Sequence, residues 1–117
     1  MRIYISHSSA FDFKNKLYDP VKNSVLMNGN EILFPHESKI KNTKDFIASC
    51  DVVIAEVSLQ STGQGIELGW ADAFGIPILC VYEKGSTITT SLNFISNDIT
   101  EYENANDLIC KLIEKLG

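Results

Sequence analysis

The residues best suited to chemistry lie in the segment 61–71, Ser-Thr-Gly-Gln-Gly-Ile-Glu-Leu-Gly-Trp-Ala. Glu67 stands two residues beyond Gly63 and Gly65, a Gly-x-Gly pair that predicts a turn leading into a helix. The run before it, 51–57, is short, apolar and rich in β-branched residues, as in a buried parallel strand. Such a strand, glycine turn and helix present backbone amides and a helix dipole to a ligand. We therefore expect Glu67 in the first turn of a helix, beside a bound phosphate or sugar.

A glutamate at this position has two alternative roles. It can attack the anomeric carbon of a sugar and form a covalent glycosyl ester, which a second acceptor resolves with net retention. It can also serve only to stabilise the start of the helix, because acidic side chains favour the positive end of the dipole. An isolated first-turn glutamate favours the second role, so the choice depends on the rest of the sequence.

Strand-like apolar runs alternate with helical patterns along the chain. The expected strands are 2–6, 31–34, 51–57, 77–82 and, more weakly, 98–100. The expected helices are 12–28, 42–49, 65–75, 87–95 and 104–116. Pro20 predicts a kink or two helices within 12–28, and Gly29 and Gly75 are natural helix ends. The alternation predicts an α/β three-layer sandwich whose parallel sheet has about five strands, as in flavodoxin-like and Rossmann-like folds.

Ligands of such folds bind beyond the carboxyl ends of the strands. Three polar loops are expected to meet there, at residues 6–9, 35–38 and 58–65. Their candidate substrate contacts outside the glycine-rich segment are Ser6, His7, Ser8 and His36.

Composition limits the classes of function. The 117 residues, 44% of them apolar, predict one domain over 1–117, and a deep site in so small a chain is expected to need a second subunit. The net charge of -5 argues against nucleic-acid and acidic-membrane partners. No signal peptide or membrane-spanning run is apparent, which predicts a cytoplasmic protein. Cys50, Cys80 and Cys110 suit reduced core thiols, and the two histidines show no metal-ligand spacing, so we expect neither a metal nor a cofactor.

Three segments carry a family resemblance: 51–57, Ser61-x-Gly-x-Gly-x-Glu-Leu-Gly-x-Ala71, and 78–82. From Asp51 to Tyr82 the sequence resembles the nucleoside 2-deoxyribosyltransferase superfamily, especially its 2'-deoxynucleoside 5'-phosphate N-hydrolase branch. That resemblance implies cleavage or transfer of the N-glycosidic bond of a 2'-deoxynucleoside or its 5'-monophosphate. It also implies that Glu67 is the nucleophile and that the hydroxyl of Tyr4, in the first strand, lies beside it.

The same resemblance implies where the substrate is held. Residues that match the 5'-phosphate contacts of the hydrolase branch are Ser8, Ser61, Gly63 and Gly65. Each of these is also an ordinary turn residue. Ser91 matches a serine that reaches the phosphate of the neighbouring subunit, so the resemblance implies a homodimer with shared sites.

Two departures from the family pattern concern the first loop and the acid that protonates the leaving base. His7 stands where the family usually has a glycine, and it either narrows the pocket or supplies another polar contact. An ungapped alignment puts Thr43 where the family has its aspartate, and Asp45 follows two residues later. A small shift of the helix makes Asp45 the acid, and His36 and Glu37 are the other candidates.

Two other functions are also consistent with the sequence. Residues 5–9, Ile-Ser-His-Ser-Ser, also resemble the first strand and loop of TIR-type domains, some of which bind or cleave NAD with a glutamate. The missing aspartate is consistent with a catalytically silent nucleotide-binding or signalling module.

Overall fold

The computed structural model describes residues 1–117 and contains a single five-stranded sheet in the order β2-β1-β3-β4-β5. The strands are β1 (Arg2–His7), β2 (Glu31–Leu33), β3 (Val52–Glu56), β4 (Ile78–Glu83) and β5 (Asp98–Tyr102). All four neighbouring pairs are parallel. The predicted α/β fold with a parallel sheet is confirmed, and the strand order is that of flavodoxin-like proteins.

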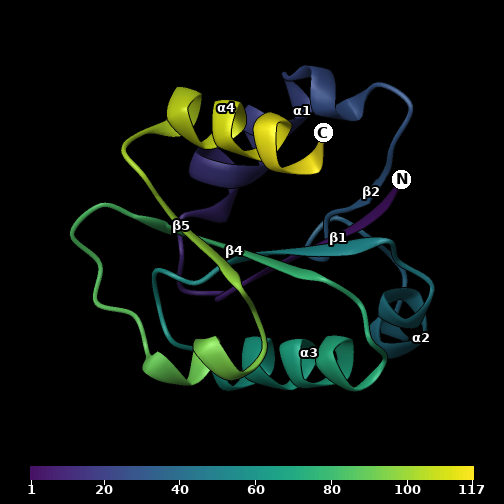
Figure 1. Cartoon of the computed structure of the whole chain (residues 1–117). Helices are drawn as coiled ribbons and strands as arrows, with labels where there is room; N and C mark the ends of the chain where they lie inside the picture. Colours follow the sequence, from purple (N-terminus) through teal and green to yellow (C-terminus); the bar gives the residue numbers. More distant parts are fainter.

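Helices cover both faces of the sheet (Figure 1). On one face lie α1 (Asp19–Lys22) and α4 (Ala105–Leu116), and on the other lie α2 (Thr43–Ala48) and α3 (Thr62–Ala73). Each face has its own apolar core. Successive residues of β1 point to opposite faces, so Ile3 and Ile5 pack on the α4 side and Tyr4 packs on the α3 side.

The expected helix 12–28 is broken into three short pieces. They are the π-helical turn η1 (Lys14–Tyr18), α1, and the 3₁₀ helix η2 (Val25–Met27). Pro20 lies at the start of α1, where a missing N–H costs nothing, which confirms the predicted division. Gly29 and Gly75 have φ of 74° and 71°, so both predicted helix ends adopt the left-handed conformation that favours glycine.

Two expectations about helices are wrong. The segment 87–95 contains only a short 3₁₀ helix, η3 (Thr90–Phe94), because the β-branched run Thr87-Ile-Thr-Thr90 opposes helix formation. The helix α3 begins at Thr62 and not at Gly65, after an extended Ser61. Gly63 and Gly65 therefore lie inside the helix, neither has a positive φ, and Glu67 lies in the second turn.

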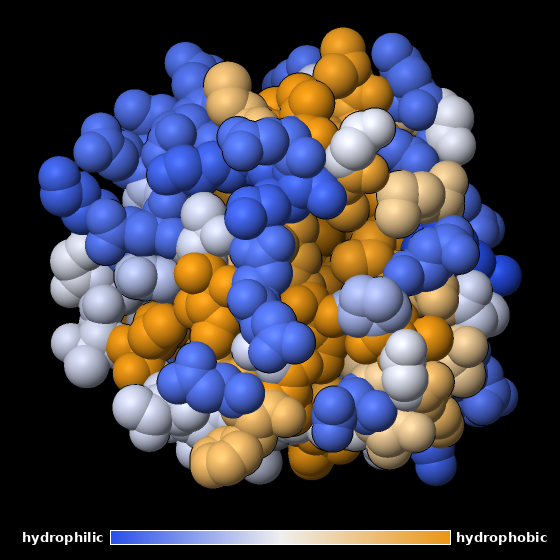
Figure 2. Space-filling model, viewed as in Figure 1, coloured by the Kyte–Doolittle hydropathy of each residue, from blue (hydrophilic) through white to orange (hydrophobic).

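The molecular surface is mixed in character. Figure 2 shows apolar residues reaching the surface through the middle of the face turned to the viewer, where β4 and β5 lie in Figure 1. Hydrophilic residues collect at the upper left of that view. No helix in the structure combines the length and the apolar composition needed to cross a membrane.

Candidate active site

The carboxylate of Glu67 faces the sheet, where two side chains of β1 donate hydrogen bonds to it. The hydroxyl of Tyr4 donates to Oε2, and the hydroxyl of Ser6 donates to Oε1 at 3.0 Å. Tyr4 and Ser6 are two residues apart on a strand, so they share the face that packs against α3. The expected neighbourhood of Tyr4 and Glu67 is confirmed. The hydroxyl of Ser6, expected to contact the substrate, serves to orient the carboxylate.

Burial sets the charge state of this pair. Burial raises the pKa of Glu67, while the hydrogen bonds from Tyr4 and Ser6 and the nearby His36 act in the opposite direction. Burial and the neighbouring Glu67 carboxylate raise the pKa of Tyr4, so the tyrosine keeps its proton and acts as a donor. The arrangement holds a partly desolvated carboxylate in one orientation, which is what a nucleophile requires.

Removing the tyrosine hydroxyl tests this arrangement. In Tyr4→Phe the carboxylate loses one donor, so the pKa of Glu67 rises further. If Glu67 is the nucleophile, only its ionised carboxylate attacks. The acidic limb of the kcat/KM profile is then expected to move to higher pH, and kcat/KM near neutral pH to fall about tenfold. The measurement is a pH–rate profile of both proteins. Tyr82→Phe, on β4 and outside the hydrogen bonds of the site, is the control. An unmoved acidic limb in Tyr4→Phe would contradict the role given to this hydroxyl.

His7 is engaged entirely by protein groups. Its Nδ1 lies 2.9 Å from the carbonyl oxygen of Ser8, and its Nε2 lies 2.6 Å from the hydroxyl oxygen of Tyr18. A carbonyl oxygen only accepts, so Nδ1 carries the proton, and the neutral ring accepts from Tyr18 at Nε2. Burial lowers the pKa of His7, which favours this neutral form. The ring also stacks on Phe13 with centroids 4.6 Å apart, so the polar contact expected of His7 is made within the fold.

Ser8 shapes the loop after β1. It is buried, and its Oγ accepts a hydrogen bond from the backbone N–H of Ala10 at 3.1 Å. Of the two roles expected for Ser8, phosphate contact and turn residue, the hydroxyl serves the turn.

A polar cavity of about 190 Å³ opens in front of Glu67. Its wall brings together five of the predicted site residues, namely His7, His36, Ser61, Gly63 and Glu67. His36 is exposed, and its backbone N–H donates to the hydroxyl of Tyr18 at 3.2 Å, which ties the loop after β2 to the end of η1.

Asp45 lies outside this cavity. It is exposed in the first turn of α2, where its Oδ2 accepts from the side chain of Asn42 at 2.7 Å. Its backbone N–H donates to Oδ1 of the same asparagine at 3.1 Å. In this chain Asp45 therefore takes part in capping α2 and does not face Glu67 across the cavity.

A second cavity, of about 380 Å³, flanks the other side of the start of α3. It is lined by hydroxyl and glycine positions that include Ser61, Gly65, Thr89 and Ser91. Ser61 and Gln64 line both cavities, and neither cavity has a lysine or arginine in its wall. An anionic group bound in either cavity would depend on hydroxyls, backbone amides and the helix dipole.

The first two glycines of α3, Gly63 and Gly65, have a role different from the predicted turn. Glycine in a helix interior is less stable than alanine by about 1 kcal/mol. A Cβ built on Gly65 meets nothing within 4 Å, and one on Gly63 meets only the hydroxyl of Ser61 at 4.0 Å. The protein's own packing therefore does not require glycine here, and the effect of both residues is to leave the cavity walls bare for a ligand.

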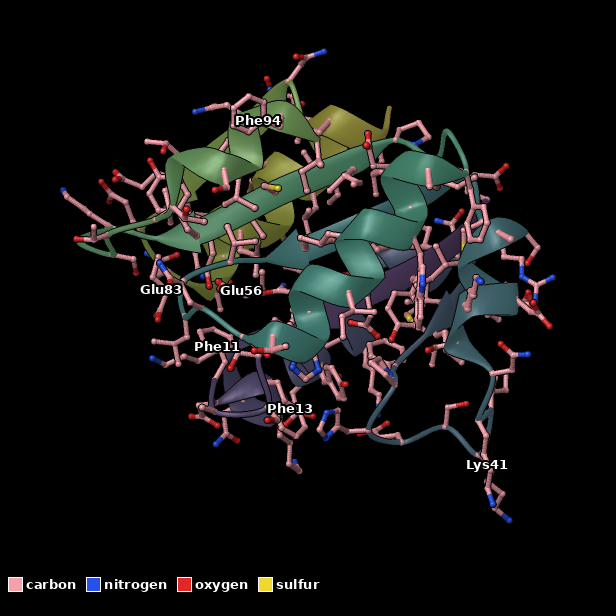
Figure 3. The ribbon with its side chains drawn as sticks, turned by 90° about the horizontal axis from the view of Figure 1, so that it is seen from below. Phe11, Phe13, Lys41, Glu56, Glu83 and Phe94 are labelled. Atoms are coloured by element: carbon pink, nitrogen blue, oxygen red, sulfur yellow. The ribbon has the colours of Figure 1, made fainter.

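A buried carboxylate that the sequence reasoning missed supports the loop before α3. Glu56, only 1% exposed, accepts from the N–H of Ser58 at 2.6 Å and from the hydroxyl of Tyr102. Its carbonyl oxygen accepts from Nε2 of Gln64 at 2.8 Å. In Figure 3, Glu56 lies near Glu83 at the end of the sheet where α3 begins. The available signal was a single acid within the apolar run 52–57.

Tyr102→Phe is expected to lower the free energy of unfolding by about 1–3 kcal/mol, because the buried Glu56 loses a donor. Burial already raises the folded-state pKa of Glu56 above its unfolded value, so its contribution is full at low pH and is lost as pH rises through the folded pKa. The variant raises that pKa further, so its deficit is larger near pH 8 than near pH 5. Urea unfolding at about these two pH values measures the loss of unfolding free energy, with Tyr82→Phe as control. An equal loss at both pH values would contradict the role of the Tyr102 hydroxyl as a donor to Glu56.

No family model matches the chain. Over 53 residues, 45% of the chain, it is 43% identical to 5-hydroxymethyl-dUMP N-hydrolase of Rattus norvegicus. The matched part spans only 24% to 37% of the length of the curated relatives.

Solved structures match over nearly the whole chain. The CMP N-glycosidase of Clostridium botulinum superposes with a TM-score of 0.71 and 25% identity, covering 97% of this chain and 99% of that one. The 2-deoxyribosyltransferase of Bacillus psychrosaccharolyticus superposes with a TM-score of 0.66 over 92% of this chain and 90% of that one. At 19% identity the second likeness concerns the fold alone. The chain therefore shares its whole fold with a CMP N-glycosidase and a 2-deoxyribosyltransferase, and about 45% of its sequence is similar to nucleotide N-hydrolases.

Proposed function

We propose that residues 1–117 form one domain that cleaves or transfers the N-glycosidic bond of a 2'-deoxynucleoside or its 5'-monophosphate. The observation that carries this proposal is the carboxylate of Glu67, oriented by Tyr4 and Ser6 at the wall of a polar cavity. The names of the relatives support it, since they describe N-hydrolases and an N-glycosidase that act on nucleotides.

The reaction has two steps. A carboxylate oxygen of Glu67 bonds to C1' of the sugar as the C1'–N bond breaks, and the base leaves with the electron pair and a proton from an acid. Water, or an N–H nitrogen of a second base, then attacks C1' of the glycosyl ester and gives its proton to the conjugate base of that acid, while the ester C1'–O bond breaks and the carboxylate of Glu67 is released. Two inversions at C1' give net retention.

His36 is our candidate for the proton donor, in preference to Asp45 and Glu37. Its support is a place on the wall of the cavity that also contains Glu67. The carboxylate of Asp45 bonds to Asn42, and that of Glu37 pairs with Lys22, so both are engaged elsewhere. Asp45 could protonate the leaving base only if α2 moved so that its carboxylate left Asn42 and reached the cavity.

The second cavity is our candidate for the 5'-phosphate. Support comes from the hydroxyls of Ser61 and Ser91 in one wall and from the bare backbone of Gly65. Because the cavity has no lysine or arginine, binding of a monophosphate is expected to depend only weakly on salt.

We further propose a cytoplasmic homodimer. Phe94, in the same 3₁₀ helix as Ser91, is 87% exposed. Ile66 on α3 is also exposed, and these two apolar side chains are our candidates for the contact between subunits. The free cysteines Cys50 and Cys80 are buried, which suits a reducing compartment, whereas Cys110 is exposed and the expectation of a core thiol there is wrong. Sedimentation of the purified chain measures the oligomeric state.

The deciding experiment is chromatography of free base released from a substrate panel. The panel contains deoxynucleosides, deoxynucleoside 5'-monophosphates, ribonucleotides including CMP, and NAD, each with and without an acceptor base. Base release from a deoxy substrate supports the proposal, and formation of a new nucleoside with the acceptor identifies a transferase. Consumption of NAD alone would favour the TIR-like alternative, and binding without turnover would favour the silent module.

A further inference from the structure

Gln64 is a nearly buried polar side chain that lies between the two cavities. It is 5% exposed and lines both of them. Its Nε2 donates to the carbonyl oxygen of Glu56 at 2.8 Å, and because a carbonyl oxygen only accepts, this contact fixes which way the amide points. The opposite atom, Oε1, receives no hydrogen bond from the protein and is not sealed from the cavities.

The residue that accepts from Gln64 is itself held in place, which fixes the orientation of the Gln64 amide. The Glu56 carbonyl belongs to the end of β3, and the carboxylate of the same residue is held by Ser58 and Tyr102. An amide oxygen that is held in place without a partner is a preorganised acceptor, and an acceptor selects a ligand group that carries a proton. Hydroxyls of a sugar meet that condition, whereas the oxygens of an ionised phosphate do not.

The helix sets the distance between Gln64 and the nucleophile. Residues 64 and 67 are three apart on α3, so they lie on the same face, about 4.5 Å apart along the axis. A sugar whose C1' is at Glu67 and whose 5' end reaches Ser91 spans both cavities, and Gln64 and Ser61 are the two residues that line both.

We propose that Gln64 is a specificity-determining residue whose Oε1 accepts a hydrogen bond from a ring hydroxyl of the sugar. This inference rests on the proposed function and adds to it the group by which the sugar is selected. A substrate that lacks the hydroxyl leaves Oε1 unpaired after water has been displaced, which penalises binding of that substrate.

The test combines Gln64→Met with three nucleotides that share one base. The 5'-monophosphates are the ribonucleotide, the 2'-deoxynucleotide and the 2',3'-dideoxynucleotide. If the 3'-hydroxyl is the partner, the variant loses about tenfold in kcat/KM on the first two and nothing on the third. If the 2'-hydroxyl is the partner, only the ribonucleotide shows the loss. Gln60→Met is the matched control. Gln60 lines the second cavity, where all three substrates place the same 5'-phosphate, so any effect is expected to be equal on the three and to leave their ratios unchanged.

The experiment distinguishes failure of the inference about Gln64 from failure of the proposed function. An equal loss on all three substrates would overturn the role of Gln64, because a merely structural residue affects every substrate alike. No turnover of any substrate by the wild-type chain would overturn the proposed function and this inference with it. Circular dichroism checks the fold of each variant, and Gln64→Val, which also lacks the acceptor, replaces a methionine variant that does not fold.

Discussion

Glu67→Gln is expected to lower kcat for base release by about 10⁴-fold or more, because an amide cannot form the glycosyl ester. The variant keeps the size of the side chain at a position that contacts Tyr4 and Ser6, so the fold is expected to persist. Single-turnover chromatography of the base measures the loss. A protein with retained turnover would remove Glu67 as the nucleophile.

The same variant is expected to be more stable than the wild type at neutral pH. Burial raises the folded-state pKa of Glu67 above its unfolded value, so the contribution of this group to stability is present at low pH and is lost as pH rises through the folded pKa. Glutamine does not titrate, so the gain in melting temperature grows over that pH range. Glu114→Gln, an exposed change on α4 at the opposite face, is the control and should alter neither activity nor melting temperature.

His36→Gln is expected to lower kcat/KM by about 10²-fold on a natural substrate, because the departing base then lacks its proton donor. Chromatography of the base released by both proteins at one pH measures the loss in kcat/KM.

Two controls separate acid catalysis from other effects. A deoxyriboside with a nitrophenolate leaving group needs no proton, so His36→Gln should cleave it almost as fast as the wild type does. Asp45→Asn is the competing variant, and a larger loss with it than with His36→Gln would assign the acid to Asp45. An equal loss of His36→Gln on both kinds of leaving group would mean that His36 binds substrate and donates no proton.

Local patterns were sufficient for most of the fold. The β-branched runs that became β1, β3 and β4 are buried on both sides, which is why they read as continuous apolar segments. Pro20 and the two helix-ending glycines act through their own backbone restrictions, so their effects could be read without tertiary contacts. The predictions were wrong at 87–95 and at the start of α3, where weak helix formers give no clear boundary.

The candidate site was predictable only where a motif marked it. The family resemblance indicated Glu67 and Tyr4 together, and the structure brings them into contact. Gln64 and Glu56 carried no such mark, because a glutamine in a glycine-rich segment and one acid in an apolar strand look unremarkable in sequence. Their roles come from a hydrogen bond between side chain and backbone that joins α3 to β3.

The amino-acid sequence alone thus determined the parallel α/β architecture and the identity of the candidate nucleophile, because periodicity and a local motif depend on residues close together in the chain. The tertiary structure alone decided the rest of the site. It engaged His7 with Tyr18 and left His36 on the cavity wall, since packing between distant loops determines which polar atoms find protein partners. It also places Asp45 at the cap of α2 and leaves Oε1 of Gln64 without a protein partner. Which polar atoms pair depends on their proximity in three dimensions and not on residue type.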